Sequence, residues 1–224
     1  PRSRGLGDVY KRQALFLALT IGFTLSLLGL NHAAARYVAY LQGRGEEGRA
    51  WATARKAAAV ALAAAALTAA PLAASSRLVS ELLFRSSSYV YAVLAASLTI
   101  IPANAGLMLM GLLQGLKRFS RMALAEVLGQ LARLSCTVAL VALGLGALGA
   151  LLGWTAFYLA LIAVALPPLI PRLLRAGGFE PASTVELLAF STPLMSLYFV
   201  SYLLNAVDQF VVLGLLGVGE MGCY

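Results

Sequence analysis

Three polar side chains interrupt an apolar run between residues 122 and 143: Glu126, Gln130 and Arg133. In a helix of 3.6 residues per turn, positions four and seven apart lie near one face, so the three would form a polar stripe. Insertion scales put an arginine at the centre of a membrane helix at about +3 kcal/mol, so Arg133 is expected to face protein or a wet cavity. A guanidinium suits phosphate geometry, which favours contact with a phosphate-bearing ligand. An internal ion pair or hydrogen bond between helices is the alternative.

The composition identifies the surroundings of these side chains. Hydrophobic residues make up 61% of the chain and charged residues 12%, whereas soluble domains are about half apolar and about a quarter charged. The apolar runs are continuous rather than alternating, which favours an all-α, polytopic membrane helical bundle over a barrel. The two cysteines and the single histidine form no disulfide framework or ligand cluster, so no cofactor or metal is expected.

Six apolar runs have the length of membrane spans. They are residues 14–30, 57–74, 90–116, 122–143, 150–169 and 185–216. The first helix is predicted to continue without a break to Leu41. The fifth is predicted to end at its prolines, with Arg172 and Arg175 following in a loop. Residues 75–88, a few charges among leucines, are predicted to form an interfacial connector.

The run 90–116 carries polar and small residues of structural interest. Asn104 and Gln114 are candidate cavity residues, although polar side chains within spans more often form hydrogen bonds between helices. Gly111 and Gly115 are four residues apart, a spacing that lets another helix approach closely. We therefore expect this run to pack tightly against a neighbouring helix.

Basic residues are unevenly distributed among the predicted loops, and the positive-inside rule converts this into an orientation. Loops after the odd-numbered runs hold ten basic residues and loops after the even-numbered runs hold two, which places the odd loops in the cytoplasm. We expect a multi-pass protein of the cytoplasmic membrane. The ten are Arg36, Arg44, Arg49, Arg55, Lys56, Lys117, Arg118, Arg121, Arg172 and Arg175, and the two are Arg77 and Arg85.

Both chain ends are predicted to be non-native. Residues 3–13 can be encoded by DNA that resembles a transposase sequencing adapter, so residues 1–13 are set apart as an adapter-derived scar; a basic cytoplasmic lead is the alternative. Without this segment four basic residues and one acidic residue are lost, and the net charge falls from +8 to +5. The basic balance therefore gives no reason to expect nucleic acid as a partner. Because the sequence also stops at Tyr224 directly after an apolar run, we expect an internal fragment of a longer protein.

Three stretches carry motifs in a recognisable order. A Gly-Leu…Arg-Tyr helix end lies in Leu25–Tyr37, a Gln-Gly…Arg-Phe turn in Gly111–Phe119, and an Asp…Leu-Gly…Glu-x-Gly-x-Tyr helix end in Asp208–Tyr224. Together they resemble the oligosaccharide flippase family, which includes Wzx-type O-antigen flippases, of the multidrug/oligosaccharidyl-lipid/polysaccharide (MOP, MATE-like) exporter superfamily. The resemblance implies two lobes around a central cavity that opens alternately to each side. Residues 14–178 would match helices two to six of the first lobe, and residues 179–224 helix seven, at the start of the second lobe.

The resemblance also implies roles for residues and partners. It implies transport of an undecaprenyl-diphosphate-linked oligosaccharide, surrounded by membrane lipids and with glycan polymerases or ligases as further partners, and no enzyme activity. Arg36 matches a family arginine that would draw an anionic head group into the cavity, with positive-inside anchoring as the alternative. Asp208 matches an acidic position that would carry a coupling proton or cation, with a salt bridge as the alternative.

Two other functions stay open at this point. A cation-coupled multidrug antiporter of the MATE type would favour acidic over basic cavity groups, and Arg133 argues mildly against it. A membrane-embedded glycan polymerase or ligase usually exposes a large polar outer loop, and the connector 75–88 is short by comparison.

Overall fold

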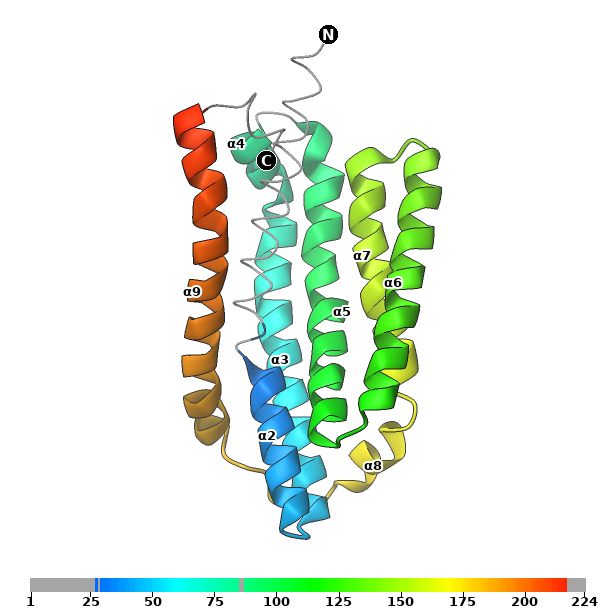
Figure 1. Cartoon of the computed structure of the whole chain (residues 1–224), viewed down its shortest axis with the longest axis vertical. Helices are drawn as coiled ribbons and strands as arrows, with labels where there is room; N and C mark the ends of the chain where they lie inside the picture. Colours follow the sequence, from blue (N-terminus) through cyan, green and yellow to red (C-terminus); the bar gives the residue numbers. More distant parts are fainter. Residues whose placement is uncertain (1–26, 28, 85–86, 217–224) are drawn as a thin grey trace.

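The computed structural model describes residues 27, 29–84 and 87–216 (Figure 1). Within that part of the chain it contains helices and no strand, which confirms the all-α prediction. The elements are α2 (Leu30–Gly43), α3 (Glu47–Ala74), α4 (Ser76–Phe84), the short 3-10 helix η1 (Ser87–Tyr89), α5 (Val90–Gly115), α6 (Phe119–Ala142), α7 (Gly146–Ala165), α8 (Ile170–Arg175) and α9 (Thr184–Leu216).

Four of the described helices are long and apolar enough to cross a membrane. They are α3, α5, α6 and the Leu148–Ala165 part of α7, and they run along the long axis of the molecule (Figure 1). The chain is therefore a multi-pass membrane protein. The predicted first span, 14–30, lies almost wholly outside the described residues. In α9, the described side chains give a shorter apolar stretch, Thr184–Leu197.

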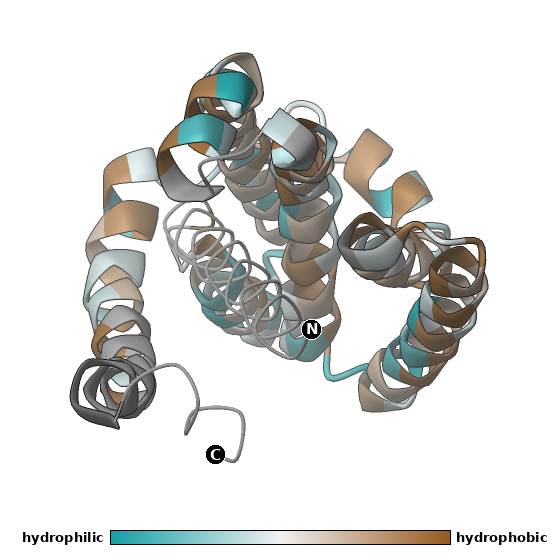
Figure 2. Cartoon of the chain, turned by 90° about the horizontal axis from the view of Figure 1, so that it is seen from above, coloured by the Kyte–Doolittle hydropathy of each residue, from teal (hydrophilic) through white to brown (hydrophobic). Residues whose placement is uncertain are grey.

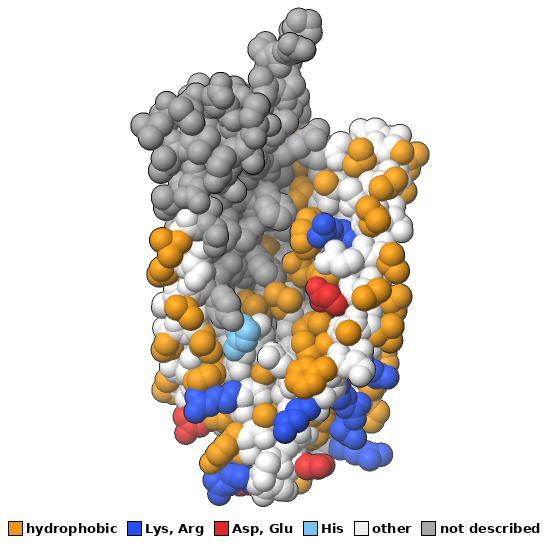
Figure 3. Space-filling view, in the orientation of Figure 1, with side chains coloured by type: hydrophobic (Ala, Val, Ile, Leu, Met, Phe, Trp, Pro, Cys, Tyr) orange, Lys and Arg blue, Asp and Glu red, His pale blue; other side chains and the backbone are white. Residues whose placement is uncertain are grey.

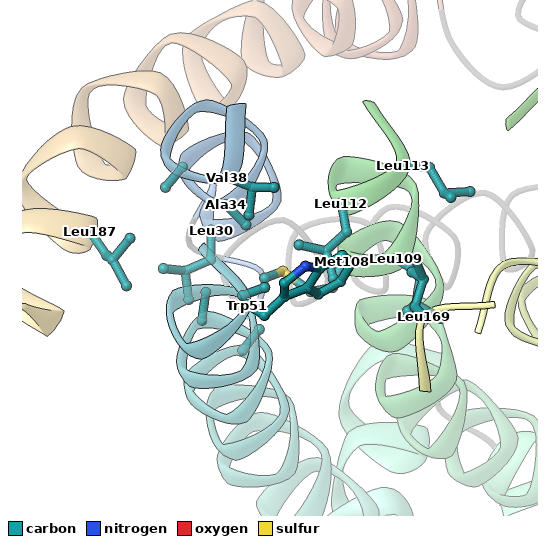
Figure 4. Packing of buried hydrophobic residues seen from close by; sticks show 14 of the residues in the cluster. Leu30, Ala34, Val38, Trp51, Met108, Leu109, Leu112, Leu113, Leu169 and Leu187 are labelled. Atoms are coloured by element: carbon teal, nitrogen blue, oxygen red, sulfur yellow. The ribbon is translucent and has the colours of Figure 1, made fainter. Parts of the chain in front are cut away.

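Seen from above, the described helices follow an arc with α9 and α6 at its two ends (Figure 2). α5 is the central helix, because it packs against α2, α3 and α7. The main core cluster joins α2, α3 and α5, and within it Trp51 lies beside Met108 (Figure 4). α6 buries only Ala125 and Gly129. Most of the α6 surface is therefore not covered by the other described helices.

α2 crosses α5 at the predicted glycine pair. A Cβ atom on Gly111 would overlap the backbone oxygen of Asn31, and a Cβ atom on Gly115 would lie 2.5 Å from the backbone oxygen of Ala35. Only a residue without a side chain allows two backbones to approach so closely. The close helix approach predicted from the glycine spacing is confirmed, and the partner helix is α2.

The prediction of an unbroken first helix up to Leu41 is wrong. α2 begins at Leu30, and Gly29 before it has a φ of 65°, a left-handed conformation that does not continue a right-handed helix. A Cβ atom on Gly29 would also lie 2.8 Å from the backbone oxygen of Ser191 in α9. The break therefore coincides with the place where α9 passes close to the chain, and an apolar run contains no sign of such a contact.

The loop predicted around Arg172 and Arg175 is instead the short helix α8. Pro171 lies in its first turn, where the missing N–H would have no partner within the helix and proline is tolerated. α8, the α2–α3 connection and the α5–α6 turn lie at the same end of the bundle (Figure 1). Figure 3 shows basic side chains gathered at this end. The loops predicted to share one side of the membrane thus share one end of the molecule.

Candidate functional site

α6 and α7 approach each other closely through two glycines. A Cβ atom on Gly129 of α6 would lie 2.8 Å from the ring of Phe157. On the other helix, a Cβ atom on Gly153 would overlap the Thr137 side chain and lie 3.2 Å from the backbone oxygen of Arg133. The crossing therefore holds the backbone of Arg133 at a fixed position against α7.

Arg133 reaches α7 through its guanidinium group. Its Cζ atom lies 4.1 Å from the centre of the Trp154 ring. Trp154 meets Phe157 edge-on with ring centres 5.7 Å apart and stacks on Tyr158 at 6.1 Å. Arg133 is half-buried, and a cation over an indole stabilises more when partly desolvated than at a wet surface. Trp154 is not among the residues predicted from the sequence.

The predicted polar stripe is present on α6, but its members differ in environment. Glu126 and Gln130 are exposed, whereas Arg133 is half-buried. Helical periodicity places Glu126 about 20° and Gln130 about 60° around the helix axis from Arg133. Within the described residues, Glu126 and Arg133 form no ion pair. Tyr158 of α7 interacts electrostatically with both Glu126 and Arg133. The stripe therefore borders α7.

The stripe lies toward the inside of the arc. In Figure 2 the hydrophilic positions of α6 lie on the side of the helix that faces the inside of the arc, and hydrophobic positions lie on the outside. Figure 3 shows an acidic and a basic side chain part-way up the molecule, above the basic side chains at its lower end. The hydrophilic positions of α6 therefore lie on the concave side of the arc and not on its convex side.

A second arginine–aromatic pair joins α2 to α9. Arg36 is exposed, and its Cζ atom lies 4.1 Å from the centre of the Phe190 ring. The same ring meets Tyr37 edge-on with centres 6.5 Å apart, and Leu187, one turn earlier in α9, is fully buried. Arg36 is thus held by α9 on one side and open on another, which is compatible with both of its predicted roles.

The remaining predicted site residues are not gathered on this stripe. Asn104 is fully buried in α5, and its side-chain amide donates a hydrogen bond to the backbone oxygen of Ile100 at 3.0 Å. Gln114 is exposed in the last turn of α5. Asp208 belongs to α9, but its side chain lies outside the described residues. Asn104 is therefore buried in the bundle with a hydrogen bond inside its own helix, and the functional roles of all three residues stay predictions.

The structure also shows a backbone clamp that sequence reasoning missed. The Thr53 hydroxyl, fully buried in α3, accepts the backbone N–H of Ala182 at 3.0 Å, and the Lys56 ammonium donates to the carbonyl of Ala182 at 3.1 Å. Arg49 donates to the backbone oxygen of Glu180 at 3.3 Å. α3 therefore fixes the segment that leads into α9. The partners lie 126 to 131 residues apart, so no local sequence signal announces the contact.

Comparison with known protein families gives one match of nearly full length. The family model described as polysaccharide biosynthesis protein matches residues 4–224. Neither the curated proteins nor the solved structures give a match. The matched region contains all of the described helices, and with them the pairs Arg36–Phe190 and Arg133–Trp154. The chain belongs to the polysaccharide biosynthesis protein family, the family of Wzx-like flippases within the MOP exporter superfamily.

Proposed function

We propose that this chain forms the first lobe, and the start of the second, of a transporter that moves an undecaprenyl-diphosphate-linked oligosaccharide from the cytoplasmic to the outer leaflet by alternating access, for surface polysaccharides such as O-antigen. Membership of the family supports a flippase role in polysaccharide synthesis. The observation that carries the finer proposal is the guanidinium of Arg133, held in the middle of α6 by an indole ring instead of by an acid.

A diphosphate head group meets its highest energetic barrier where the membrane excludes water, because an unpaired charge is strongly disfavoured in a medium of low dielectric constant. An arginine offers a permanent positive charge and donors that match two phosphate oxygens. Because Arg133 forms no ion pair with Glu126, its charge is available to a ligand. We assign the diphosphate contact to Arg133 and contacts with sugar hydroxyls to Glu126 and Gln130, which are exposed beside it.

Arg36 in α2 and Asp208 in α9 complete the proposal. Arg36 lies in α2 near the end of the bundle that carries the basic loops, where it would attract the anionic head group. Asp208 would carry the coupling proton or cation. Gln114, exposed at the same end of α5 as the α5–α6 turn, would contribute a hydrogen bond to an entering substrate.

The test compares Arg133→Gln and Arg133→Lys in a strain that depends on this protein for surface glycan. Loss of a charge-assisted contact predicts that Arg133→Gln reduces export about tenfold or more, while Arg133→Lys retains part of it. Arg175→Gln, at an exposed position of α8, is the matched control and should export normally. The amount of protein in the membrane is measured alongside. Normal export by Arg133→Gln would remove the diphosphate contact from the proposal.

A cation-coupled multidrug antiporter is the second candidate, and the exposed carboxylate of Glu126 is the observation that favours it. In that case Glu126→Gln would stop transport and Arg133→Gln would not, and efflux from proteoliposomes would follow a sodium or proton gradient. We further propose that the chain is a transporter and not a glycan polymerase or ligase, since members of the family are generally transporters.

A further inference from the structure

Trp154 lies in the middle of α7, an unusual depth for a tryptophan. Tryptophans of membrane helices concentrate at the two interfaces, where the ring is in an apolar layer and the N–H is in a wet one. The chain has two tryptophans, and the other one, Trp51, belongs to the core between α2, α3 and α5. Interfacial anchoring therefore does not explain Trp154.

The indole of Trp154 is held in place by its own helix and by α6. It packs edge-on against Phe157, which is 5% exposed, and stacks on Tyr158 with an angle of 28° between the rings. Gly153, the residue before Trp154, has no side chain, so the α6 backbone at Arg133 can approach the α7 backbone closely. The indole thus forms a fixed platform at the place where Arg133 leaves the α6 backbone.

A contact between a cation and a ring face uses none of the hydrogen-bond donors of a guanidinium. With Cζ 4.1 Å from the ring centre, Trp154 stabilises the charge of Arg133 while its N–H groups stay available to phosphate oxygens. An acidic partner would hold the same side chain but would occupy its donors and cancel its charge. An indole is therefore the better resting partner for an arginine that must bind an anion.

Glu126 is the acidic partner that Arg133 would otherwise find. It lies two turns earlier on nearly the same face of α6, and no ion pair joins the two in the described residues. In a medium of low dielectric constant, opposite charges on one face attract strongly. The Arg133 side chain instead lies over Trp154 of α7, with no ion pair to Glu126.

We propose that Trp154 is a positioning residue, which keeps the guanidinium of Arg133 pointed toward α7, uncancelled by Glu126 and ready for a phosphate-bearing head group. This inference rests on the proposed function, in which Arg133 contacts a diphosphate. In the ligand-free protein the indole is the partner of the guanidinium, and a bound diphosphate takes its place. Trp154 acts through Arg133 and does not itself touch the substrate.

The first measurement uses Trp154 as its own reporter. In the Trp51→Phe background, Trp154 is the only tryptophan of the chain. The full chain in lipid nanodiscs is titrated with radiolabelled farnesyl diphosphate, and both bound label and indole emission are recorded. Emission is expected to change with the same saturation curve as binding, because the cation leaves the ring. Farnesol should cause no change, and Arg133→Gln should show the altered emission from the start and no response to diphosphate.

The second measurement separates positioning from packing. Trp154→Leu is expected to bind farnesyl diphosphate about tenfold more weakly, and Trp154→Phe, which keeps a ring face, about threefold more weakly. Adding Glu126→Gln to Trp154→Leu removes the competing acid and should recover at least half of the lost affinity on a logarithmic scale. A purely structural role for the indole predicts no such recovery.

The outcomes distinguish the two proposals. Absence of diphosphate binding, or equal binding by Arg133→Gln, would overturn the proposed function and this inference with it. Diphosphate binding that requires Arg133, together with unresponsive Trp154 emission and Trp154→Leu affinity within twofold of the unsubstituted protein, would overturn the positioning role alone. If Trp154→Leu does not accumulate, Trp154→Phe and the emission response in the Trp51→Phe background decide.

Discussion

Among the arginine–aromatic pairs of the described residues, the two shortest have the same separation and very different surroundings. Arg36 over Phe190 and Arg133 over Trp154 are both at 4.1 Å. Arg36 is exposed, near the end of the bundle with the basic loops, whereas Arg133 is half-buried in the middle of a span. Cation–π contacts contribute about 0.5–1 kcal/mol at exposed sites and about 2 kcal/mol or more when desolvated. The stabilisation by each contact is therefore set by its environment and not by its distance.

The helices that carry the two pairs also differ in how extensively they pack, and the Arg133 pair again lies in the more enclosed place. α6 and α7 fit together over much of their length through Gly129 and Gly153, so we expect them to move as one body. α2 and α9 meet over a shorter stretch, where Gly29 lies close to Ser191. Opening the α2–α9 contact during transport would break fewer packing interactions than opening the α6–α7 contact. The following substitutions are ways to break or sharpen this contrast.

The largest effect is expected for Gly29→Ala at the α2–α9 joint. Its φ of 65° disfavours a residue with a side chain by about 1–2 kcal/mol, and the new Cβ atom would lie 2.8 Å from the backbone oxygen of Ser191. Strain of this kind typically adds about 1–3 kcal/mol. A loss of about 3 kcal/mol in the free energy of unfolding is expected, measured by denaturation in detergent micelles.

Gly45→Ala separates the two contributions, because Gly45 has a φ of 77° and no atom within 4 Å of the new Cβ position. It should lose only the conformational part, about 1–2 kcal/mol. Equal losses from Gly29→Ala and Gly45→Ala would show that the approach of α9 to Gly29 contributes nothing to stability.

Gly153→Ala tests the α6–α7 joint and should have the next largest effect. The new Cβ atom would overlap the Thr137 side chain and crowd the backbone oxygen of Arg133, with an expected loss of about 2 kcal/mol in the free energy of unfolding. Gly43→Ala is the matched control, since Gly43 is helical with nothing within 4 Å, and alanine there should be neutral or slightly stabilising. A neutral Gly153→Ala would mean that α6 can slide on α7 and that Arg133 is less fixed than the contact indicates.

The sequence predicted best what depends on short stretches of chain. α5 begins at Val90 as predicted and ends at Gly115, one residue before the predicted end, because an apolar run and its flanking charges are local properties. The glycine pair Gly111 and Gly115 predicted a close helix contact for the same reason. The identity of the partner, α2, follows only from the fold, since any helix with small side chains at the contact would satisfy the pattern.

Two features that the sequence did not predict, the break at Gly29 and the partner of Arg133, both involve contact between separate helices. The positive φ of Gly29 occurs where Ser191 of α9 comes close to the chain, and an apolar run has no trace of that contact. The site was predicted as a stripe on one helix because periodicity relates residues within a helix only. The stripe exists, but the partner of Arg133 is Trp154 on the next helix. One signal was available, since a tryptophan in the middle of a span needs a reason other than the interface.

The most specific effect is the coupling energy within each pair, obtained from double-mutant cycles that cancel the packing lost in each single variant. For Arg133→Gln with Trp154→Leu we expect about 2 kcal/mol of coupling in the free energy of unfolding, and for Arg36→Gln with Phe190→Leu about 0.5 kcal/mol. The difference should persist at high salt, because screening acts mainly on exposed charges such as Arg36. Equal couplings at both sites would show that Arg133 is as hydrated as Arg36. In that case the indole would give no special stabilisation to a charge in the middle of the membrane, and Arg133 would need substrate or water, rather than Trp154, to hold its place.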